Sequence, residues 1–286
     1  MKIIVIFISI FLFNQAFGQS QIFTYQYQFI PDSTSTENKV SQLMILNINK
    51  NRSEFYSLEK MKIDSTLLDR RIKGDNDPRY TQSEYITTYR ILKYRNDKTI
   101  DHKLTLGVSP YVLKDDREIK WKLESEFAEI LGYKVQKATT TFGGRKWIAY
   151  FTRDIPFTDG PYKFRGLPGL IVKVEDENYQ HEFELIGVKN STENFVYPTS
   201  VSLKDLPTID YKMFKRKFKE YRDNPAADLL GSIPDQVDRN GNMKTGTELW
   251  LEISKKEKDK LKKDMDMQIK FPVKVKLHFD KFCFDY

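Results

Sequence analysis

Three side chains near the middle of the chain are of types that could do acid–base or anion-binding chemistry: Arg145, Asp154 and Tyr162. An arginine can present a bidentate fork to a carboxylate, and a positioned carboxylate can act as a general acid or base. A single acid without a partner at a known spacing is more often a turn residue, and Arg145 could equally pair with Asp154 or Glu175. We therefore predict no catalytic residue, and keep a hydrolase or protease-related enzyme using these three residues as the alternative.

Other catalytic and metal-binding patterns are missing from the sequence. His102, His181 and His278 are far apart and form no HxxxH or HxH ligand pair. No serine lies in a Gly-x-Ser-x-Gly elbow, and residues 166–169 are not followed by the Lys-Ser or Lys-Thr of a phosphate loop. Cys283 is the one cysteine and has no intrachain partner. We predict neither a metal nor a cofactor, and no disulfide.

A stretch rich in glycine and proline, residues 160–171, follows Asp154. Glycine opens backbone angles that are closed to other residues and proline fixes φ, so the stretch predicts a shaped, rigid turn. The apolar run 170–174 predicts a strand that begins directly after the turn. Tyr162 and Phe164 flank Lys163 within the turn, where they could either wall an apolar groove or belong to the core.

The elements that must position this turn are predicted to be mostly strands. In residues 146–151, Trp147 and Phe151 fall on one face and Ile148 and Tyr150 on the other, which indicates a central strand covered on both sides. Alternating or apolar runs bounded by turn residues predict the other strands. These strands are 21–30, 43–48, 53–58, 85–94, 103–106, 111–114, 120–123, 133–142, 170–175, 181–188 and a C-terminal group within 271–286.

Helices are predicted to be few. Residues 210–222 place Tyr211, Phe214, Phe218 and Tyr221 at spacings of three and four, which predicts an amphipathic helix that covers the sheet. Shorter helical segments are expected at 67–72, at 124–132, where a glycine would end a connecting turn, and at 254–265 on the surface. The fold class is therefore mainly β (α+β): a strongly curved antiparallel sheet, similar in outline to the half-barrels that carry lipoproteins.

The N-terminus has the pattern of a secretory signal peptide. One lysine precedes the apolar run 3–13, and small residues at Ala16 and Gly18 predict cleavage after residue 18. No cysteine lies near this position, so a lipid anchor is not expected there. We predict a periplasmic or secreted protein with no transmembrane segment after signal removal, and one domain over 19–286 with a motif core at 121–175 and a helical and loop insertion at about 205–265.

Charge and composition bear on the partners. The 286-residue chain carries a formal net charge of +7, and 14% of its residues are aromatic. The acidic and basic residues are interspersed through most of the chain, and the aromatic or zinc-knuckle signatures of nucleic-acid modules are missing. An evenly solvated surface is the favoured interpretation, and no nucleic acid is expected as a partner.

The segment 121–175 resembles the GLPGLI family of secreted Bacteroidota proteins, which have a Porph_ging-type domain. Residues 166–171 spell GLPGLI, and the surrounding family pattern is similar to Trp121, Gly132-Tyr133, Ala138-Thr139, Gly144-Arg145, the strand 147–152, Asp154-Ile155-Pro156 and Gly160-Pro161-Tyr162. The resemblance implies an exported, β-rich protein and brings no established activity. Gln136 stands where many relatives carry cysteine, which argues against a shared thiol- or metal-based activity.

Taken together, these observations predict a non-catalytic binding or carrier module in the cell envelope. Its ligand would be apolar or amphipathic, or a peptide; an accessory partner of an outer-membrane transporter, with an envelope protein as ligand, is a further alternative. The candidate binding residues are Arg145, Trp147, Tyr150, Asp154, Tyr162, Phe164, Leu167 and Leu170. The residues expected to shape the motif are Gly143, Gly144, Pro156, Gly160, Pro161, Gly166, Pro168 and Gly169.

Overall fold

The computed structural model describes residues 20–30, 39–75, 87–107, 109–192, 195–199, 201–237 and 242–270, with side chains described to residue 259. The predicted signal peptide and the predicted C-terminal strands within 271–286 lie outside these ranges. The fold class is confirmed: the protein is mostly β, with 45% strand and 23% helix, and its large curved sheet of 12 strands is not closed into a barrel.

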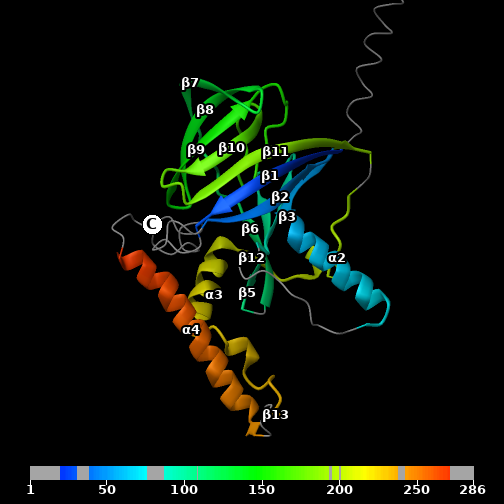
Figure 1. Cartoon of the computed structure of the whole chain (residues 1–286), viewed down its shortest axis with the longest axis vertical. Coiled ribbons are helices and arrows are strands. Elements are labelled where there is room, and N and C mark those ends of the chain that lie inside the picture. The colour runs from blue at the N-terminus through cyan, green and yellow to red at the C-terminus, as the bar shows by residue number, and fades with distance from the viewer. Residues whose placement is uncertain are drawn as a thin grey trace, which may run out of the picture.

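The sheet consists of two antiparallel meanders joined in its middle, with the short strand β12 added in parallel at one edge beside β6 (Figure 1). Its strand order is β12-β6-β5-β4-β3-β2-β1-β11-β10-β9-β8-β7. The strands are β1 (Ser20–Phe29), β2 (Val40–Ile48), β3 (Arg52–Ser57), β4 (Arg90–Tyr94), β5 (Ile100–Leu106), β6 (Ser109–Asp115), β7 (Lys122–Ile130), β8 (Tyr133–Phe142), β9 (Arg145–Thr152), β10 (Leu170–Asp176), β11 (His181–Ser191) and β12 (Thr208–Asp210). A separate small ribbon pairs β13 (Gln236–Val237) with β14 (Met243–Lys244).

The joint between the two meanders is the antiparallel pair β1–β11. Phe23 pairs with Val188 and Tyr27 with Phe183, across a separation of more than 150 residues, with one register irregularity after Thr24. On its other side β1 pairs with β2. This long-range pairing joins the two meanders into one sheet. All other antiparallel pairs in that sheet are between strands that are consecutive among its members in the chain.

One face of the sheet, which we call the inner face, carries the main core. Alternate residues of β1, Phe23, Tyr25 and Tyr27, point to this face, as the alternation in sequence predicts. The same cluster takes in residues of β2, β3, β4, β5, β8, β9, β10 and β11 and of the loop that joins β9 to β10. Strands from both halves of the sheet therefore surround one loop, and the curvature of the sheet is what brings them to it.

Two of the described α-helices, α2 (Leu58–Ile72) and α3 (Tyr211–Asp223), pack directly on the sheet. Helix α2 starts directly after β3, where the Ser57 hydroxyl accepts a hydrogen bond from the backbone N–H of Lys60, and packs against the outer face at β2 and β3. Helix α3 confirms the predicted amphipathic helix. Its Phe214 and Phe218 pack on Leu106 and Leu113, at the β5–β6 end of the sheet. Helix α4 (Gly246–Lys270) contains the predicted surface helix and is longer.

One sequence prediction about local structure was wrong, and one predicted helix is longer than expected. Residues 124–132 are not a turn of helix: most of them form the edge strand β7, and Leu131 and Gly132, with φ of 53° and 77°, make a two-residue hairpin turn. Positive φ at both positions matches the right-handed twist of the flanking strands, so the glycine serves a hairpin and not a helix end. The helix predicted at 67–72 extends back to residue 58, because the cap at Ser57 comes before the periodic residues.

Candidate functional site

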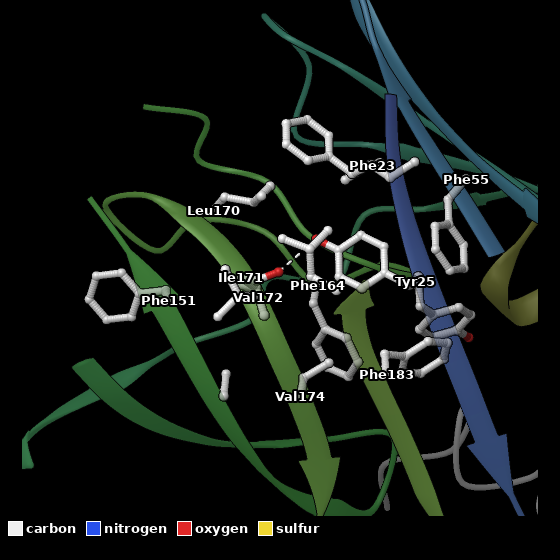
Figure 2. Close-up of a cluster of buried hydrophobic side chains, with 14 of the residues drawn as sticks. Phe23, Tyr25, Phe55, Phe151, Phe164, Leu170, Ile171, Val172, Val174 and Phe183 are labelled. Atoms are coloured by element: carbon white, nitrogen blue, oxygen red, sulfur yellow. Dashed lines mark hydrogen bonds between the residues drawn. The ribbon is translucent and has the colours of Figure 1, made fainter. Parts of the chain in front are cut away.

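The loop between β9 and β10, residues 153–169, is called here the motif loop, and its middle is buried against the inner face. Tyr162, Phe164 and Leu167 are at most 5% exposed. The Phe164 ring packs 4.8 Å from that of Trp147 in β9, and Figure 2 shows Phe164 among side chains of the neighbouring strands. The Tyr25 hydroxyl donates to the carbonyl oxygen of Ile171 at 2.7 Å, where the loop enters β10 (Figure 2). The loop is therefore part of the core.

Backbone hydrogen bonds close the motif loop on itself. The N–H of Leu170 donates to the carbonyl of Ile155 at 3.1 Å, and the N–H of Ile171 to that of Asp159 at 3.0 Å. Gly169 makes this possible, because it has a φ of +153° and a Cβ there would lie 2.0 Å from the carbonyl oxygen of Thr152. Only glycine avoids both the strained angle and the clash. Position 169 therefore has to be glycine, because the backbone there passes very close to the backbone of Thr152.

Two buried ion pairs fasten the motif loop to the β4–β6 half of the sheet. The Lys163 ammonium donates to the Asp115 carboxylate at 2.6 Å, and their side chains are 0% and 1% exposed. The Lys93 ammonium pairs with the Asp159 carboxylate and also donates to the carbonyl of Gly160 at 2.6 Å. Buried charges are tolerated only when they are paired and hydrogen-bonded. Any other position of the loop would separate these pairs, so each pair stabilises the observed position.

The carboxyl group of Asp115 pairs with two cations, Lys163 of the motif loop and Arg117. Burial alone raises its pKa, but a bidentate hydrogen bond from Arg117 at 2.8 Å and the charge of Lys163 outweigh burial and hold the pKa well below its usual range. Burial lowers the pKa of His102, whose ring lies 6.2 Å from that of Tyr162, and the nearby Lys163 charge lowers it further. His102 is accordingly expected to be neutral at pH 7.

An open cleft of about 610 Å³ lies beside the motif loop. Its walls are the β2–β3 turn with Ile48 and Arg52, the β4–β5 turn over residues 93–98, and the loop residues 156–159, Arg165 and Gly166. We call it the rim cleft. Its lining mixes basic side chains with apolar ones, and its volume is in the range of small-molecule sites.

Arg165 stands at the edge of the rim cleft and is held in position from both ends. Its carbonyl oxygen accepts a hydrogen bond from the Trp121 indole N–H at 2.9 Å, and its guanidinium donates to the carbonyl of Lys98. A second cavity of about 190 Å³ lies on its other side, lined among others by Arg117 and Lys163. The guanidinium is thus presented between two cavities on a rigid loop.

The candidate binding residues fall into three places. Trp147, Tyr162, Phe164, Leu167 and Leu170 belong to the main core. Tyr150 is half-buried and packs against that cluster, and Asp154 is exposed just beyond the end of β9, with its N–H donating to the Thr152 hydroxyl. Arg145, at the opposite end of β9, pairs with Asp176 at 2.6 Å and donates to Gln180. Their role in binding stays a prediction.

Two conclusions follow from this placement. Arg145 pairs with Asp176, so the predicted pairing with Asp154 or Glu175 was wrong. Arg145 and Asp154 lie nine residues apart along one extended strand, roughly 30 Å, and Tyr162 is buried in the core. The three side chains therefore do not converge on one cleft, which is what the hydrolase or protease-related alternative requires.

The residues predicted to shape the motif lie in the β8–β9 turn and in the motif loop. Gly143 and Gly144 form the β8–β9 hairpin turn with φ of 58° and 69°. Gly160 and Pro161 are buried, and a Cβ at Gly160 would lie 2.8 Å from that of Ile171. Pro156 and Gly166 line the rim cleft, and Pro168 is exposed.

Sequence reasoning missed the basic residues of the rim cleft: Arg52, Lys93, Arg95, Lys98 and Arg165. Only Arg165 carried a signal, because it is the charged residue next to the glycine that opens the GLPGLI run. The other four come from two hairpin turns whose meeting with the motif loop depends on the curvature of the sheet. Among the described residues, no group of three histidine, cysteine or acidic side chains could hold a metal ion.

A protein-family model described as a protein of unknown function (Porph_ging) matches residues 142–173, which confirms the resemblance seen in the sequence. Comparison with curated proteins gave no match. Two solved structures, titled "Structure of PNGF-II in C2 space group" and "Structure of PNGF-II in P21 space group", are similar to this chain with TM-scores of 0.49 and identities of 18% and 20%. Each similarity covers 71% of this chain and about a third of the matched chain. Similarities at this level carry no argument about function.

We predict that Gly169→Ala prevents or strongly impairs folding, because its Cβ would overlap the Thr152 carbonyl oxygen. Gly166→Ala is the matched control: its φ of +94° is also positive, but nothing lies within 4 Å of the added Cβ. It should cost only about 1–2 kcal/mol. Urea unfolding of both variants measures the difference, and equal effects would contradict the close approach described here.

We predict that Asp115→Asn destabilises the protein by about 3–5 kcal/mol, because it leaves the Lys163 ammonium buried without a carboxylate. The double variant Asp115→Asn/Lys163→Met should lose much less than the sum of the two single variants. Chemical unfolding of all four proteins in a double-mutant cycle provides the measurement. Additive losses would show that the pair does not couple the loop to β6.

The pH dependence of stability follows from the same carboxyl group. Because the folded-state pKa of Asp115 is depressed, its contribution to stability is fully present above the unfolded-state pKa of about 3.9 and is lost as the pH falls below it. The wild type should therefore lose more stability between about pH 5 and pH 2 than the Asp115→Asn/Lys163→Met variant. Parallel stability curves for the two proteins over this range would contradict the depressed pKa.

Proposed function

We propose that this protein is an exported, non-catalytic binding module of the cell envelope, and that its amphipathic ligand binds in the rim cleft. The observation that carries the proposal is the mixed lining of this cleft beside a rigid loop. Basic side chains stand next to the exposed Pro156 and the half-buried Phe157, so one site offers both a charged and an apolar surface. Export is supported by the predicted signal peptide.

The rim cleft supports binding better than the interior of the sheet does. A carrier for an apolar ligand needs an empty apolar cavity, whereas the inner face holds the motif loop itself, with Phe164 and Leu167 at most 1% exposed. Displacing the loop would separate the pairs Lys163–Asp115 and Lys93–Asp159, which leaves buried charges unpaired. We therefore place the ligand at the rim and assign the buried aromatic residues to stability.

The proposal includes a peptide as the ligand, or a segment of an envelope protein, provided that it presents apolar and charged groups together. Among the described residues, no helix has the length and apolar character needed to span a membrane. Such a partner would contact the protein at the cleft and the surface around it. Capture of cross-linked partners at a photoreactive residue placed at position 157 tests this form of the proposal.

We predict that the mature protein binds a fluorescent amphipathic probe, 11-(dansylamino)undecanoic acid, with a saturable rise in emission. Phe157→Ala should weaken this binding about five- to tenfold, because it removes apolar contact area from the cleft. Phe127→Ala is the matched control, since Phe127 is 68% exposed on β7 and does not line the cleft. Titration by fluorescence measures both dissociation constants.

Two outcomes would contradict the proposal. The first is the absence of saturable binding by the wild type, and the second is an equal loss of affinity in both variants. Leu167→Asp should instead unfold the protein, because it places a carboxylate in the core, and its loss of binding would be explained by loss of structure. Circular dichroism of each variant separates these cases.

A further inference from the structure

We propose that the rim cleft recognises a phosphate group of its ligand, and that Arg95 and Arg165 are the residues that bind it. This inference rests on the proposed function, because it names the chemistry of the ligand that the same cleft would take. It is carried by the balance of charges in the cleft, by the way these charges are paired, and by the fixed position of Arg165.

The lining of the rim cleft is strongly basic. Five of its side chains are cationic, Arg52, Lys93, Arg95, Lys98 and Arg165, and two are carboxylates, Asp97 and Asp159. The whole chain, by contrast, has 47 basic and 40 acidic residues. The cleft thus concentrates positive charge in a partly enclosed space, where field lines are focused and an anion is attracted.

Most of these cations already have a carboxylate partner. Lys93 pairs with Asp159, Arg52 lies 3.5 Å from Glu54, and the exposed Lys98 lies 3.9 Å from Glu118. For Arg95 and Arg165, no carboxylate lies within 4.0 Å among the described residues. These two guanidinium groups therefore face the cleft with their charge uncompensated by a direct partner.

The charge of Arg165 acts inside the cleft. Burial lowers the pKa of Lys93, the Asp159 carboxylate opposes this effect, and the Arg165 charge lowers the pKa further. The backbone N–H of Thr99 lowers the pKa of the exposed Asp97, and the charges of Lys114 and Arg165 act in the same direction. The Arg165 charge therefore acts on two residues that line the cleft, Lys93 and Asp97.

The position of Arg165 is set before any ligand binds. The Trp121 indole fixes its carbonyl oxygen at 2.9 Å, and one guanidinium N–H is used on the carbonyl of Lys98. A guanidinium has five N–H donors in a planar fork, so donors remain for a ligand. The backbone N–H of Arg95 donates to the carbonyl of Asn51 at 3.0 Å, which extends the β3–β4 pairing into the turn that carries Arg95.

A phosphate fits this arrangement better than a single carboxylate does. It carries up to two negative charges and several acceptor oxygens, which match two unpaired arginines beside Lys98 and Arg52. In the smaller cavity on the far side of Arg165, the cations Lys98, Arg117 and Lys163 already have the carboxylate partners Glu118 and Asp115, so the phosphate is assigned to the rim cleft. Pro156 and Phe157 would contact the apolar part of a ligand whose phosphate lies at the arginines.

The test uses inorganic pyrophosphate as the probe, with isothermal titration calorimetry on the mature protein at low salt. We expect saturable binding that weakens as the salt concentration rises. Arg165→Gln and Arg95→Gln should each lower the affinity by about tenfold or more, since each removes a charge-assisted hydrogen bond. Arg216→Gln on the exposed face of α3 makes the same change in charge outside the cleft and should leave the affinity unchanged.

A second arm separates the two sources of a phosphate group. Vesicles of phosphatidylglycerol and of phosphatidylcholine are sedimented with the protein. Binding to phosphatidylglycerol that is lost in Arg165→Gln identifies a lipid headgroup, whereas binding to pyrophosphate alone identifies a soluble phosphate. Arg95 is exposed, so Arg95→Gln keeps the test decisive even if Arg165→Gln fails to fold.

The inference is overturned if neither pyrophosphate nor phosphatidylglycerol binds, or if Arg216→Gln weakens binding as much as the two cleft variants do. Its failure differs from failure of the proposed function. A protein that binds the dansylated fatty acid through Phe157 but no phosphate retains the rim cleft as its ligand site. A protein that binds neither probe loses both proposals.

Discussion

The structure depends on the burial of charged side chains of the motif loop against the inner face of the sheet. The Lys163–Asp115 pair is almost inaccessible to water, and Lys93 reaches both a carboxylate and a backbone carbonyl of the loop. Each pair joins an element of one meander to the loop that follows β9 in the other. Because separating such a pair leaves a buried charge, the two halves of the curved sheet are coupled through the loop.

This constraint decides where a ligand can bind. Phe164 and the neighbouring aromatic rings fill the space that a carrier protein would leave for its cargo. The same loop, having filled the interior, presents Arg165 and Phe157 at the edge of the sheet. The rigidity of the loop therefore serves the site indirectly, since an arginine whose backbone carbonyl and guanidinium are both already hydrogen-bonded loses little freedom when it binds an anion.

The candidate site shows where reasoning from sequence reached its limit. Tyr162 could have been a groove wall or a core residue, and the structure places it in the core at 5% exposed. Arg145 looked like a ligand-binding arginine, but it is paired with Asp176. Arg52 and Arg95 had no signal at all, because each lies in an ordinary hairpin turn, and only the fold brings those turns beside the motif loop.

The sequence by itself determined the local structure: the alternating strands, the amphipathic helix over Tyr211–Asp223, the glycine turn at 143–144 and the turn rich in glycine and proline. These features follow from the period of apolar residues and from backbone sterics, which act between near neighbours. Tertiary structure alone decided the β1–β11 pairing, the partners of Lys163 and Lys93, and the position of the rim cleft. Such contacts join residues distant in the chain, and they depend on the curvature of the whole sheet.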